Sequence, residues 1–577
     1  MHLSRIKKIT GFFAMVTLAI GTSSADPWSF GLMGDTQWKT NLDGQNPGTV
    51  AAGIIKQLNA RFIAHNVKFV VQVGDLVDSY SDANGRFSHR ANACQDLYNA
   101  GIGFFPLRGN HESSRAAANE LNVAFPQTTG SGSNVFGTFN FTSPMQALQG
   151  LSYSFEYNNA TFVIIDQFTR KDGSNSRNDT GLVGQIDWIR NVLTSRPAST
   201  HAFLFAHKNL CGGNHSDGLF GANPSALPAI QNTFYDICAS NGVRYVVGGH
   251  DHMHCRSLMV SPDRQSVLEQ LICSSNSYKF YIPLVPGNDQ RYNITGREIP
   301  VSQQLFTIGY YIFTIDGPRV TVDYYTSPNG CNGDCDLART PVLTFTKNET
   351  FGYSLNGKKF IITRRESFEK VKDNIGAGDG YVGTSAEIVD GRNDITGSFY
   401  DARATVNEVT TGWTPRSEIG DFFKSDAFTL WGMQDSVGTC DAEKFVLSMS
   451  YDPSVTGPLA LNVKSDGGAW VRAIDKNTGG TPKFTVGPWN PGYTLGTYGI
   501  DPSSKTVWAV INHASEFAVA PSNDGDQNND GVIDNADILI INSLRNKTAI
   551  QAPLADIDND GIVTVLDARK LALLKNK

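Results

Sequence analysis

The chain has 577 residues, of which 40% are hydrophobic and 18% charged, a composition typical of a globular protein. At about 100–200 residues per domain, this length predicts about three or four domains. The formal net charge of -7, from 48 basic and 55 acidic residues, argues against a general nucleic-acid-binding protein, which needs a basic surface, but it does not exclude a nucleotide substrate.

The first 25 residues have the pattern of a secretory signal peptide. Arg5, Lys7 and Lys8 precede an apolar run over residues 9–21, and small residues stand before a cleavage site at Asp26. The apolar run is shorter than the roughly 20 residues that a membrane-spanning helix needs. We therefore expect a secreted, extracellular protein without a membrane span, in which disulfides can form. Among the eight cysteines, the spacing of Cys331 and Cys335 suggests a small loop bridge.

Residues 26–347 alternate short apolar runs with helical patterns, which predicts an α/β domain. Five apolar runs are each followed by a residue that can bind a metal ion. These residues are Asp35, Asp75, Asn110, His207, and His250 with His252. Because the carboxyl ends of strands gather along one edge of an open α/β sheet, we expect these side chains to converge. Carboxylate, amide and imidazole groups suit hard or borderline metals, and two ions bridged by a carboxylate form a phosphoryl-transfer site.

The motifs around these residues are Gly34-Asp35, Gly74-Asp75, Gly109-Asn110-His111-Glu112, His207 and Gly249-His250-Asp251-His252. In order, they resemble the five motifs of the calcineurin-like metallophosphoesterases, a superfamily that includes the purple acid phosphatases. The resemblance covers about residues 28–320 and implies two packed β-sheets flanked by helices. It also implies two divalent or trivalent metal ions (manganese, iron or zinc). Asp35 and His252 would bind one ion, Asn110, His207 and His250 the other, and Asp75 both.

The same resemblance implies a catalytic role for His111, which would contact the phosphate and protonate the leaving oxygen. Gln37 stands where many members have a metal-binding histidine, so it is a weaker metal-ligand candidate. Asp78 replaces a tyrosine of the purple acid phosphatases, so the coloured iron site is not expected. Arg108 either helps to bind the substrate phosphate or has a structural role. Asp166 follows another strand and is interpreted as the cap of a turn.

The implied activity is hydrolysis of phosphate monoesters or diesters, on a small-molecule phosphoester or a nucleotide, by attack of a metal-bridging hydroxide. The alternative is a non-catalytic extracellular binding component with a degenerate phosphoesterase fold, against which the near-complete ligand set argues. His215 and Asn214 either touch the substrate or lie in a solvent loop. Glu112 and Asp251 are expected to hydrogen-bond the metal-bound imidazoles.

Residues 348–520 contain strand-like alternation separated by Gly and Asp turns. Phe445, Leu447 and Met449 share one face of such a segment, with Val446 and Ser448 on the other. We predict a β-sandwich-like domain that binds carbohydrate, covers the active site or serves as a spacer.

Residues 521–577 contain two twelve-residue loops with the ligand positions of an EF-hand calcium loop and Gly at the sixth position. The first loop supplies Asp526, Asn528, Asp530, Val532, Asp534 and Asp537, and the second supplies Asp556, Asp558, Asp560, Ile562, Thr564 and Asp567. Each loop runs into an apolar helix. The pattern predicts a small α-helical module with two calcium ions.

This tail resembles a type I dockerin, a paired calcium-loop module of extracellular bacterial proteins. The resemblance implies binding to a cohesin-bearing scaffold or cell-surface protein. The alternative is a calcium-stabilised terminal module that acts only within the chain.

Overall fold

The computed structural model describes the chain in segments. The described residues are 26–37, 50–80, 86–131, 136–175, 181–221, 224–282, 296–328, 333–334, 342–362, 366–367, 383–389, 401–403, 407–433, 442–455, 459–464, 468–522, 527, 533–547, 555, 557 and 562–574. The predicted signal peptide, the predicted Cys331–Cys335 bridge and several predicted calcium positions lie outside them. Those positions are Asp526, Asn528, Asp530, Val532, Asp556, Asp558 and Asp560. None of the helices within the described segments has the length and apolar character that a membrane crossing requires.

The N-terminal region is built on two sheets. The first contains, in spatial order, β16 (Thr346–Ser354), β14 (Arg319–Ser327), β13 (Ile308–Asp316), β1 (Trp28–Met33), β2 (Phe69–Gln72) and β3 (Gly103–Pro106). β1, β2 and β3 pair in parallel, whereas β13 pairs antiparallel with both β1 and β14. The parallel strands therefore end at the same edge of this sheet.

The second sheet contains, in spatial order, β20 (Asp401–Arg403), β12 (Glu298–Gln304), β9 (His254–Val260), β10 (Val267–Ile272), β8 (Tyr245–Gly248), β7 (His201–Ala206), β6 (Ala160–Ile165), β5 (Tyr153–Tyr157) and β4 (Phe139–Thr142). β6, β7 and β8 are parallel neighbours, so their carboxyl ends also lie together. Two short strands, β11 (Lys279–Phe280) and β15 (Gly333–Asp334), pair separately.

An aromatic core joins the two sheets face to face. Phe30 of β1 meets Phe162 of β6 and Phe203 of β7 edge-on, with ring centroids 5.1 and 5.2 Å apart. All three side chains are fully buried. Burial of each such side chain contributes about 1.5–3 kcal/mol, so this core holds the strand ends in fixed relative positions.

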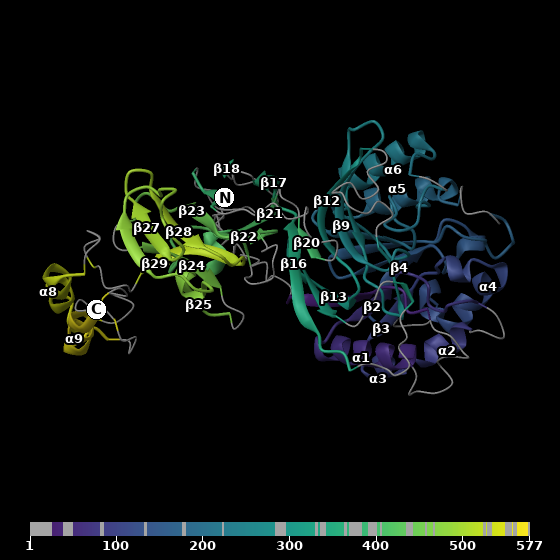
Figure 1. Ribbon diagram of the computed structural model, residues 1–577, viewed down its shortest axis with the longest axis horizontal. Helices are drawn as coiled ribbons and strands as arrows, with labels where there is room; N and C mark the ends of the chain where they lie inside the picture. Colours follow the sequence, from purple (N-terminus) through teal and green to yellow (C-terminus); the bar gives the residue numbers. More distant parts are fainter. Residues whose placement is uncertain are drawn as a thin grey trace, which may run out of the picture.

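Helices cover the outer faces of both sheets (Figure 1). Their bounds are α1 (Val50–Ala64), α2 (Phe87–Asn92), α3 (Gln95–Asn99), α4 (Arg115–Ala124), α5 (Ile186–Ser195) and α6 (Pro228–Ser240). Phe69 and Val71 of β2 join the core between the sheets, whereas Val70 packs with Leu58 and Phe62 of α1. Burial on both faces is what a parallel strand under helices requires. The predicted two-sheet α/β architecture is therefore confirmed.

The later β-rich region is also confirmed, and it consists of two further sheets. One contains β17 (Lys359–Ile362), β21 (Asn407–Thr414), β22 (Ala427–Trp431), β29 (Glu516–Pro521), β24 (Leu459–Lys464) and β25 (Trp470–Arg472). The other contains β18 (Glu366–Ser367), β19 (Ser385–Ile388), β23 (Phe445–Ser450), β28 (Thr506–Ile511), β27 (Thr497–Asp501) and β26 (Lys483–Val486). One short helix, α7 (Arg416–Ile419), follows β21.

The strand alternation in this region has its expected packing. Phe445, Leu447 and Met449 lie in the core shared by the two sheets, whereas Val446 packs on the opposite face with Trp508. A side-chain period of two requires this division between the faces.

The join between the first and second regions lies further along the chain than residue 347. β16 runs from Thr346 to Ser354 and pairs along its length with β14. Near the start of β14, Arg319 forms an ion pair of 2.9 Å with Glu516 of the β-rich region. The strand register places the start of β14 beside the amino end of β1, since Trp28 pairs with Ile315. This contact therefore attaches the β-rich region at the end of the sheet opposite the predicted metal site.

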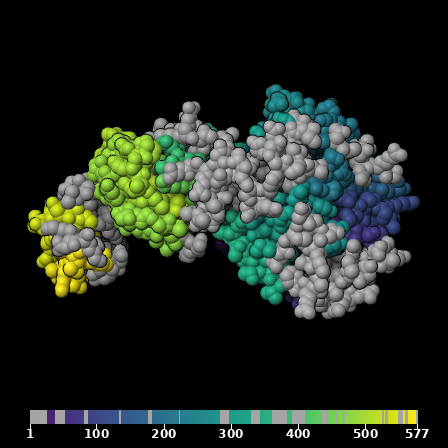
Figure 2. Space-filling model, viewed as in Figure 1, coloured from purple at the N-terminus to yellow at the C-terminus, as the bar shows by residue number. Residues whose placement is uncertain are grey.

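At the C-terminus, α8 (Asn535–Ser543) and α9 (Val565–Leu574) pack around Ile541, Val563 and Leu571. This helix pair, the β-rich region and the two-sheet region follow one another along the long axis of the molecule (Figures 1 and 2).

Candidate metal centre

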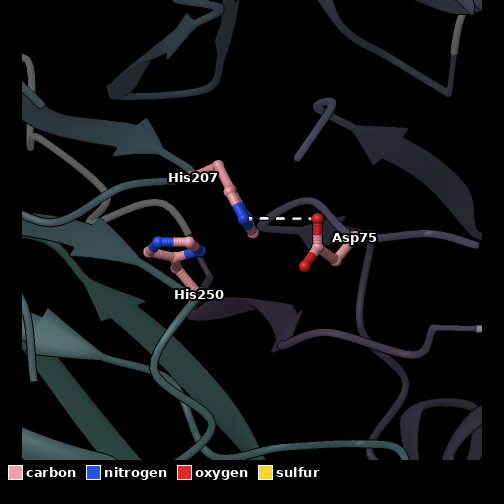
Figure 3. Close-up of side chains that lie close together, drawn as sticks. All are labelled: Asp75, His207 and His250. Carbon is pink, nitrogen blue, oxygen red and sulfur yellow. Dashed lines mark ion pairs between the residues drawn. The ribbon is translucent and has the colours of Figure 1, made fainter. Parts of the chain in front are cut away.

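The predicted metal ligands meet at the carboxyl ends of strands from both N-terminal sheets. One group consists of Asp75, His207 and His250, and another of Asp35, Asp75 and His252. Within each group, one potential ligand atom per residue lies within 4.8 Å of the others, and every residue is buried. Figure 3 shows the first group, Asp75, His207 and His250. Asp75 belongs to both groups, as the bridging role requires. Asn110 lies beside the first group, because its Oδ1 is 2.8 Å from His207 Nε2.

Main-chain carbonyl groups orient two of the imidazoles. His207 donates from Nδ1 to Val73 O at 2.8 Å, and His252 donates from Nδ1 to Lys279 O at 3.0 Å. The lone pair of each ring is then on Nε2, which lies 3.3 Å from Asp75 Oδ1 in His207 and 3.4 Å from Asp35 Oδ2 in His252. Hydrogen-bonded second nitrogens of this kind are typical of metal-binding histidines.

Backbone strain is concentrated at this centre. Gln37, Asp75, His250 and His252 have φ angles of 40, 46, 71 and 51°, in the left-handed region that non-glycine residues rarely occupy. Each such residue costs about 1–3 kcal/mol and persists only where its surroundings determine the conformation. A Cβ atom at Gly109 would lie 1.8 Å from Asp75 Oδ1, so only glycine allows this loop to approach the bridging carboxylate.

The carboxylates and imidazoles have the chemistry of a cation site. Asp35 Oδ2 accepts from the His250 amide at 2.8 Å, but Asp35 Oδ1 is buried and accepts no hydrogen bond. Burial, reinforced by the nearby Asp75 carboxylate, raises the pKa of Asp35 well above its usual range. Burial also favours the protonated form of Asp75, but His207 and three other histidines outweigh it and bring the pKa of Asp75 to about 2.

Burial lowers the pKa of His207 to about 4 and that of His252 to about 3. Both rings are therefore neutral near pH 7, the form in which imidazole binds metal. A buried oxygen without a hydrogen-bond donor, neutral imidazoles and a shared carboxylate together fit two metal ions.

His111 lies at the mouth of the site, with a quarter of its side chain exposed. Its Nδ1 contacts the carbonyl of Asp78, and its backbone amide donates to Asp75 Oδ1 at 3.2 Å. The ring belongs to neither of the ligand groups, which agrees with a role toward substrate. The Asp78 carboxylate binds Lys279 Nζ at 2.8 Å, and so it lies in an ion pair rather than at the metal groups.

Gln37 is buried beside these residues, with its amide nitrogen toward them and its amide oxygen accepting from Ser277 Oγ at 3.5 Å. Its Nε2 lies 3.3 Å from Asp75 Oδ2 and 3.2 Å from His111 Nε2. An amide nitrogen is not a metal ligand, so in this orientation Gln37 links the bridging carboxylate to His111 instead of binding an ion.

Of the two roles expected for Arg108, its contacts favour the structural one over binding of the substrate phosphate. Its guanidinium is fully buried and pairs with both oxygens of Asp166, at 2.7 and 2.9 Å. It also donates to the carbonyl groups of Glu112, Ser114 and Thr169. These bonds occupy the guanidinium inside the protein. Asp166 caps its turn as expected, since it accepts from the Phe168 amide at 2.9 Å.

Glu112 also differs from its expected role. Its carboxylate accepts from the backbone amides of Val77 and Gly109, at 2.7 and 2.8 Å, and not from an imidazole. It therefore ties together the two loops that carry Asp75 and Asn110.

The loop after β7 approaches the metal groups more closely than sequence alone indicated. The rings of His215 and His250 stack, with centroids 4.0 Å apart. Asp251 accepts from His215 Nδ1 at 3.2 Å and from the amides of Asn214 and His215. About a third of the His215 side chain is exposed, so it can meet a substrate at the site.

Sequence reasoning missed Asp217. Its Oδ1 lies 3.2 Å from His250 Nε2, and its Oδ2 binds Lys208. No motif pointed to this aspartate, because the distance along the chain from Asp217 to His250 carries no information about their contact in space.

Residues 29–254 match the family model described as "Calcineurin-like phosphoesterase", which supports the resemblance of this part of the chain to that superfamily. No curated protein matches the chain.

Several solved structures match part of the chain. The structure of PhoD is 14% identical, with a TM-score of 0.39, over 57% of this chain and 70% of that one. Purple acid phosphatase PPD1 from yellow lupin (Lupinus luteus) seeds is 14% identical, with a TM-score of 0.34, over 56% of this chain and 57% of that one. A dimetal phosphatase from Danio rerio is 14% identical, with a TM-score of 0.30, over 52% of this chain and 96% of that one.

Proposed function

We propose that this chain is a secreted phosphoesterase with two metal ions, which hydrolyses phosphate monoesters or diesters. The observation that carries the proposal is the pair of ligand groups that share Asp75, next to the Asp35 oxygen that lacks a hydrogen bond. The residues that would hold the ions are Asp35, Asp75, Asn110, His207, His250 and His252. Two ions bound there would neutralise phosphate charge and lower the pKa of a bound water molecule.

In this proposal, His111 acts as the general acid. Because Nδ1 is held by the Asp78 carbonyl, Nε2 is the ring nitrogen on the side of Asp75 and Gln37. The protonated ring donates the Nε2 proton to the leaving alkoxide of the ester. His215, stacked on His250, lines the same site and contacts the phosphate or its ester group.

The test uses full-length protein that is depleted of metal and reloaded with manganese. We expect hydrolysis of p-nitrophenyl phosphate, bis-(p-nitrophenyl) phosphate or a nucleotide from a panel, and loss of that hydrolysis on chelation. Protein that binds manganese and cleaves none of these esters would contradict the proposal and favour a non-catalytic binding component. The panel also separates monoesters, diesters and nucleotides as substrates.

We also propose that the C-terminal module binds two calcium ions and a cohesin-bearing scaffold or cell-surface protein. Equivalent contacts in its two halves support the repeat. Asp537 accepts from the amides of Gln527 and Asp534, and Asp567 accepts from those of Ile557 and Thr564. The residue at the twelfth position of each predicted loop thus makes equivalent contacts in the two halves.

Calcium should increase the helicity of this module, and the increase should vanish in the double variant Asp526→Ala plus Asp556→Ala. Binding to a cohesin in the presence of calcium, and not after its chelation, is expected of the wild type. If the module bound calcium but no cohesin, the alternative of a calcium-stabilised module that acts only within the chain would be supported. Secretion is tested by the N-terminal sequence of protein from the culture medium, which should begin at Asp26.

A further inference from the structure

The loop from Lys208 to Gly221, between β7 and α6, holds His250 on two sides. His215 covers one face of the ring, at a centroid distance of 4.0 Å. Asp217 reaches the edge of the ring, where its Oδ1 lies 3.2 Å from Nε2. Short backbone bonds anchor this end of the loop, since Leu219 N donates to Asn209 O at 2.7 Å and Gly218 N to Gly221 O at 2.8 Å.

The contact with Asp217 determines which ring nitrogen of His250 carries the proton. An ionised carboxylate only accepts hydrogen bonds, so Nε2 is the donor and the lone pair lies on Nδ1. In Figure 3 the two nitrogens of His250 lie on opposite sides of the ring, and one of them faces Asp75 and His207. With Nε2 directed to Asp217, the nitrogen that faces the ligand group is Nδ1.

His250 is thus held differently from the other two histidines. His207 and His252 donate from Nδ1 to main-chain carbonyl groups and present Nε2. Those carbonyl groups cannot be removed by substitution, whereas the partner of His250 is a side chain. The orientation of this one ligand therefore depends on a replaceable residue.

Lys208 keeps Asp217 in position. It follows His207 directly, its side chain is only 4% exposed, and its ammonium group binds Asp217 Oδ2. The ammonium also lies 5.9 Å from the centre of the Phe168 ring. A buried ammonium needs a paired anion, so Lys208 and Asp217 stabilise each other beside the metal ligands.

We propose that Asp217 is a positioning residue of the metal centre, which, supported by Lys208, holds His250 with Nδ1 toward Asp75 and His207. This inference rests on the proposed function, because it concerns the affinity of the same centre for metal. Loss of an outer partner of a metal-binding histidine weakens metal binding by about 10–100-fold. The effect is expected at the Asp75–His207–His250 group and not at the Asp35–Asp75–His252 group.

The experiment titrates metal-depleted full-length protein with manganese by calorimetry, in wild type, Asp217→Ala, Asp217→Asn and Lys208→Met. Asp236→Asn is the matched control, because this carboxylate is exposed on α6 and lies outside the site. His250→Ala sets the result for complete loss of the ligand. The thermal midpoint of each metal-free variant is measured in parallel to establish that it folds.

We expect Asp217→Ala to weaken one of two manganese sites by about 10–100-fold while the other is unchanged. Asp217→Asn should weaken this site less, since the amide oxygen of its side chain still accepts from Nε2. The manganese affinity of Lys208→Met should lie between that of Asp217→Asn and that of the wild type. Excess manganese should recover most of the ester hydrolysis that Asp217→Ala loses at limiting manganese. Recovery is not expected if Asp217 only supports the fold.

Two manganese sites of wild-type affinity in folded Asp217→Ala would overturn the inference, as would equal weakening by Asp236→Asn. If Asp217→Ala does not fold, Asp217→Asn and Lys208→Met decide, and wild-type affinity in both would overturn it. The titration is independent of catalysis. Wild type that binds manganese but cleaves no ester would contradict the proposed function and leave the test of Asp217 valid.

Discussion

The phosphoesterase-like region and the C-terminal module both contain predicted metal sites, but they assemble them in different ways. In the phosphoesterase-like region, Asp35 accepts a hydrogen bond from the amide of His250, which is 215 positions away in the sequence. In the module, Asp537 and Asp567 accept from amides only three and ten positions away. The first site depends on two sheets being packed together, and the second on a turn of the chain.

This difference predicts a different dependence on metal. In the first region, the predicted ligands follow strands that the aromatic core holds in place, so the site is formed without cations. Backbone strain and buried charge at this site destabilise the metal-free protein. The C-terminal helices share a small core around Ile541 and Leu571, and metal binding at loops such as the predicted ones generally contributes to folding. Metal removal should therefore inactivate the first region and unfold the second.

The largest expected effect is a reciprocal pair of substitutions. Asp75→Ala removes the ligand common to both groups and should abolish hydrolysis, with no change in calcium-dependent helicity. Asp567→Ala should abolish the calcium-dependent increase in helicity and leave hydrolysis unchanged. Initial rates and circular dichroism with and without calcium measure the two outcomes. If Asp567→Ala reduced hydrolysis as much as Asp75→Ala, the two sites would not be independent and the comparison would fail.

Substitution of His111 separates chemistry from metal binding within the first site. His111→Ala should lower kcat by about 10²–10⁴-fold, the usual contribution of a general acid, while both manganese ions are retained. Metal analysis together with steady-state kinetics tests this expectation. Loss of a metal ion from this variant would make His111 a ligand and refute its assigned role.

Substitution of Arg108 tests the scaffold beneath the site. Arg108→Met leaves Asp166 as an unpaired buried charge and should lower the free energy of unfolding by about 3–5 kcal/mol. The exposed Arg115→Met is the control, with an expected change within about 0.5 kcal/mol. Urea denaturation gives both values. A stable Arg108→Met variant with a raised KM would instead support contact with substrate.

The smallest expected effect is a pH dependence remote from both metal sites. Burial lowers the pKa of His201, which bonds Tyr353 and Gly317, to about 4 in the folded protein. The unfolded value is about 6.5, so the unfolded state binds more protons between these two pH values, and stability falls as pH falls through this window.

The pKa shift corresponds to roughly 3 kcal/mol in the free energy of unfolding. This contribution is fully present above about pH 6.5 and is lost as the pH falls through the window. Urea unfolding of wild type and His201→Gln at pH 7, 5.5 and 4.5 isolates this contribution, since the other buried histidines are common to both proteins. If the free energies of unfolding of the two proteins changed equally with pH, His201 would not be the source of this pH dependence.

The convergence of Asp35, Asp75, His207, His250 and His252 could be predicted because each follows a strand and parallel strands end at one edge. The burial of Phe445 and Leu447 could also be predicted, since the side chains of a strand alternate between its two faces. The role of Arg108 could not be predicted. A basic residue beside a catalytic motif fits substrate binding and structure alike, and its burial against Asp166 depends on how β3 and β6 of different sheets are placed.

The residues of the chain by themselves indicated the two-sheet architecture of the first region, the metal-binding residue types that meet there and the two loops with the spacing of calcium loops. Such patterns can be read from sequence because each metal is bound by few types of donor atom. Tertiary structure alone decided which ring nitrogens of His207 and His252 donate to main-chain carbonyl groups, that Gln37 donates to Asp75, and that Asp217 contacts His250. These are contacts between distant segments, and their geometry depends on the packing of two sheets and on loops that no local pattern specifies.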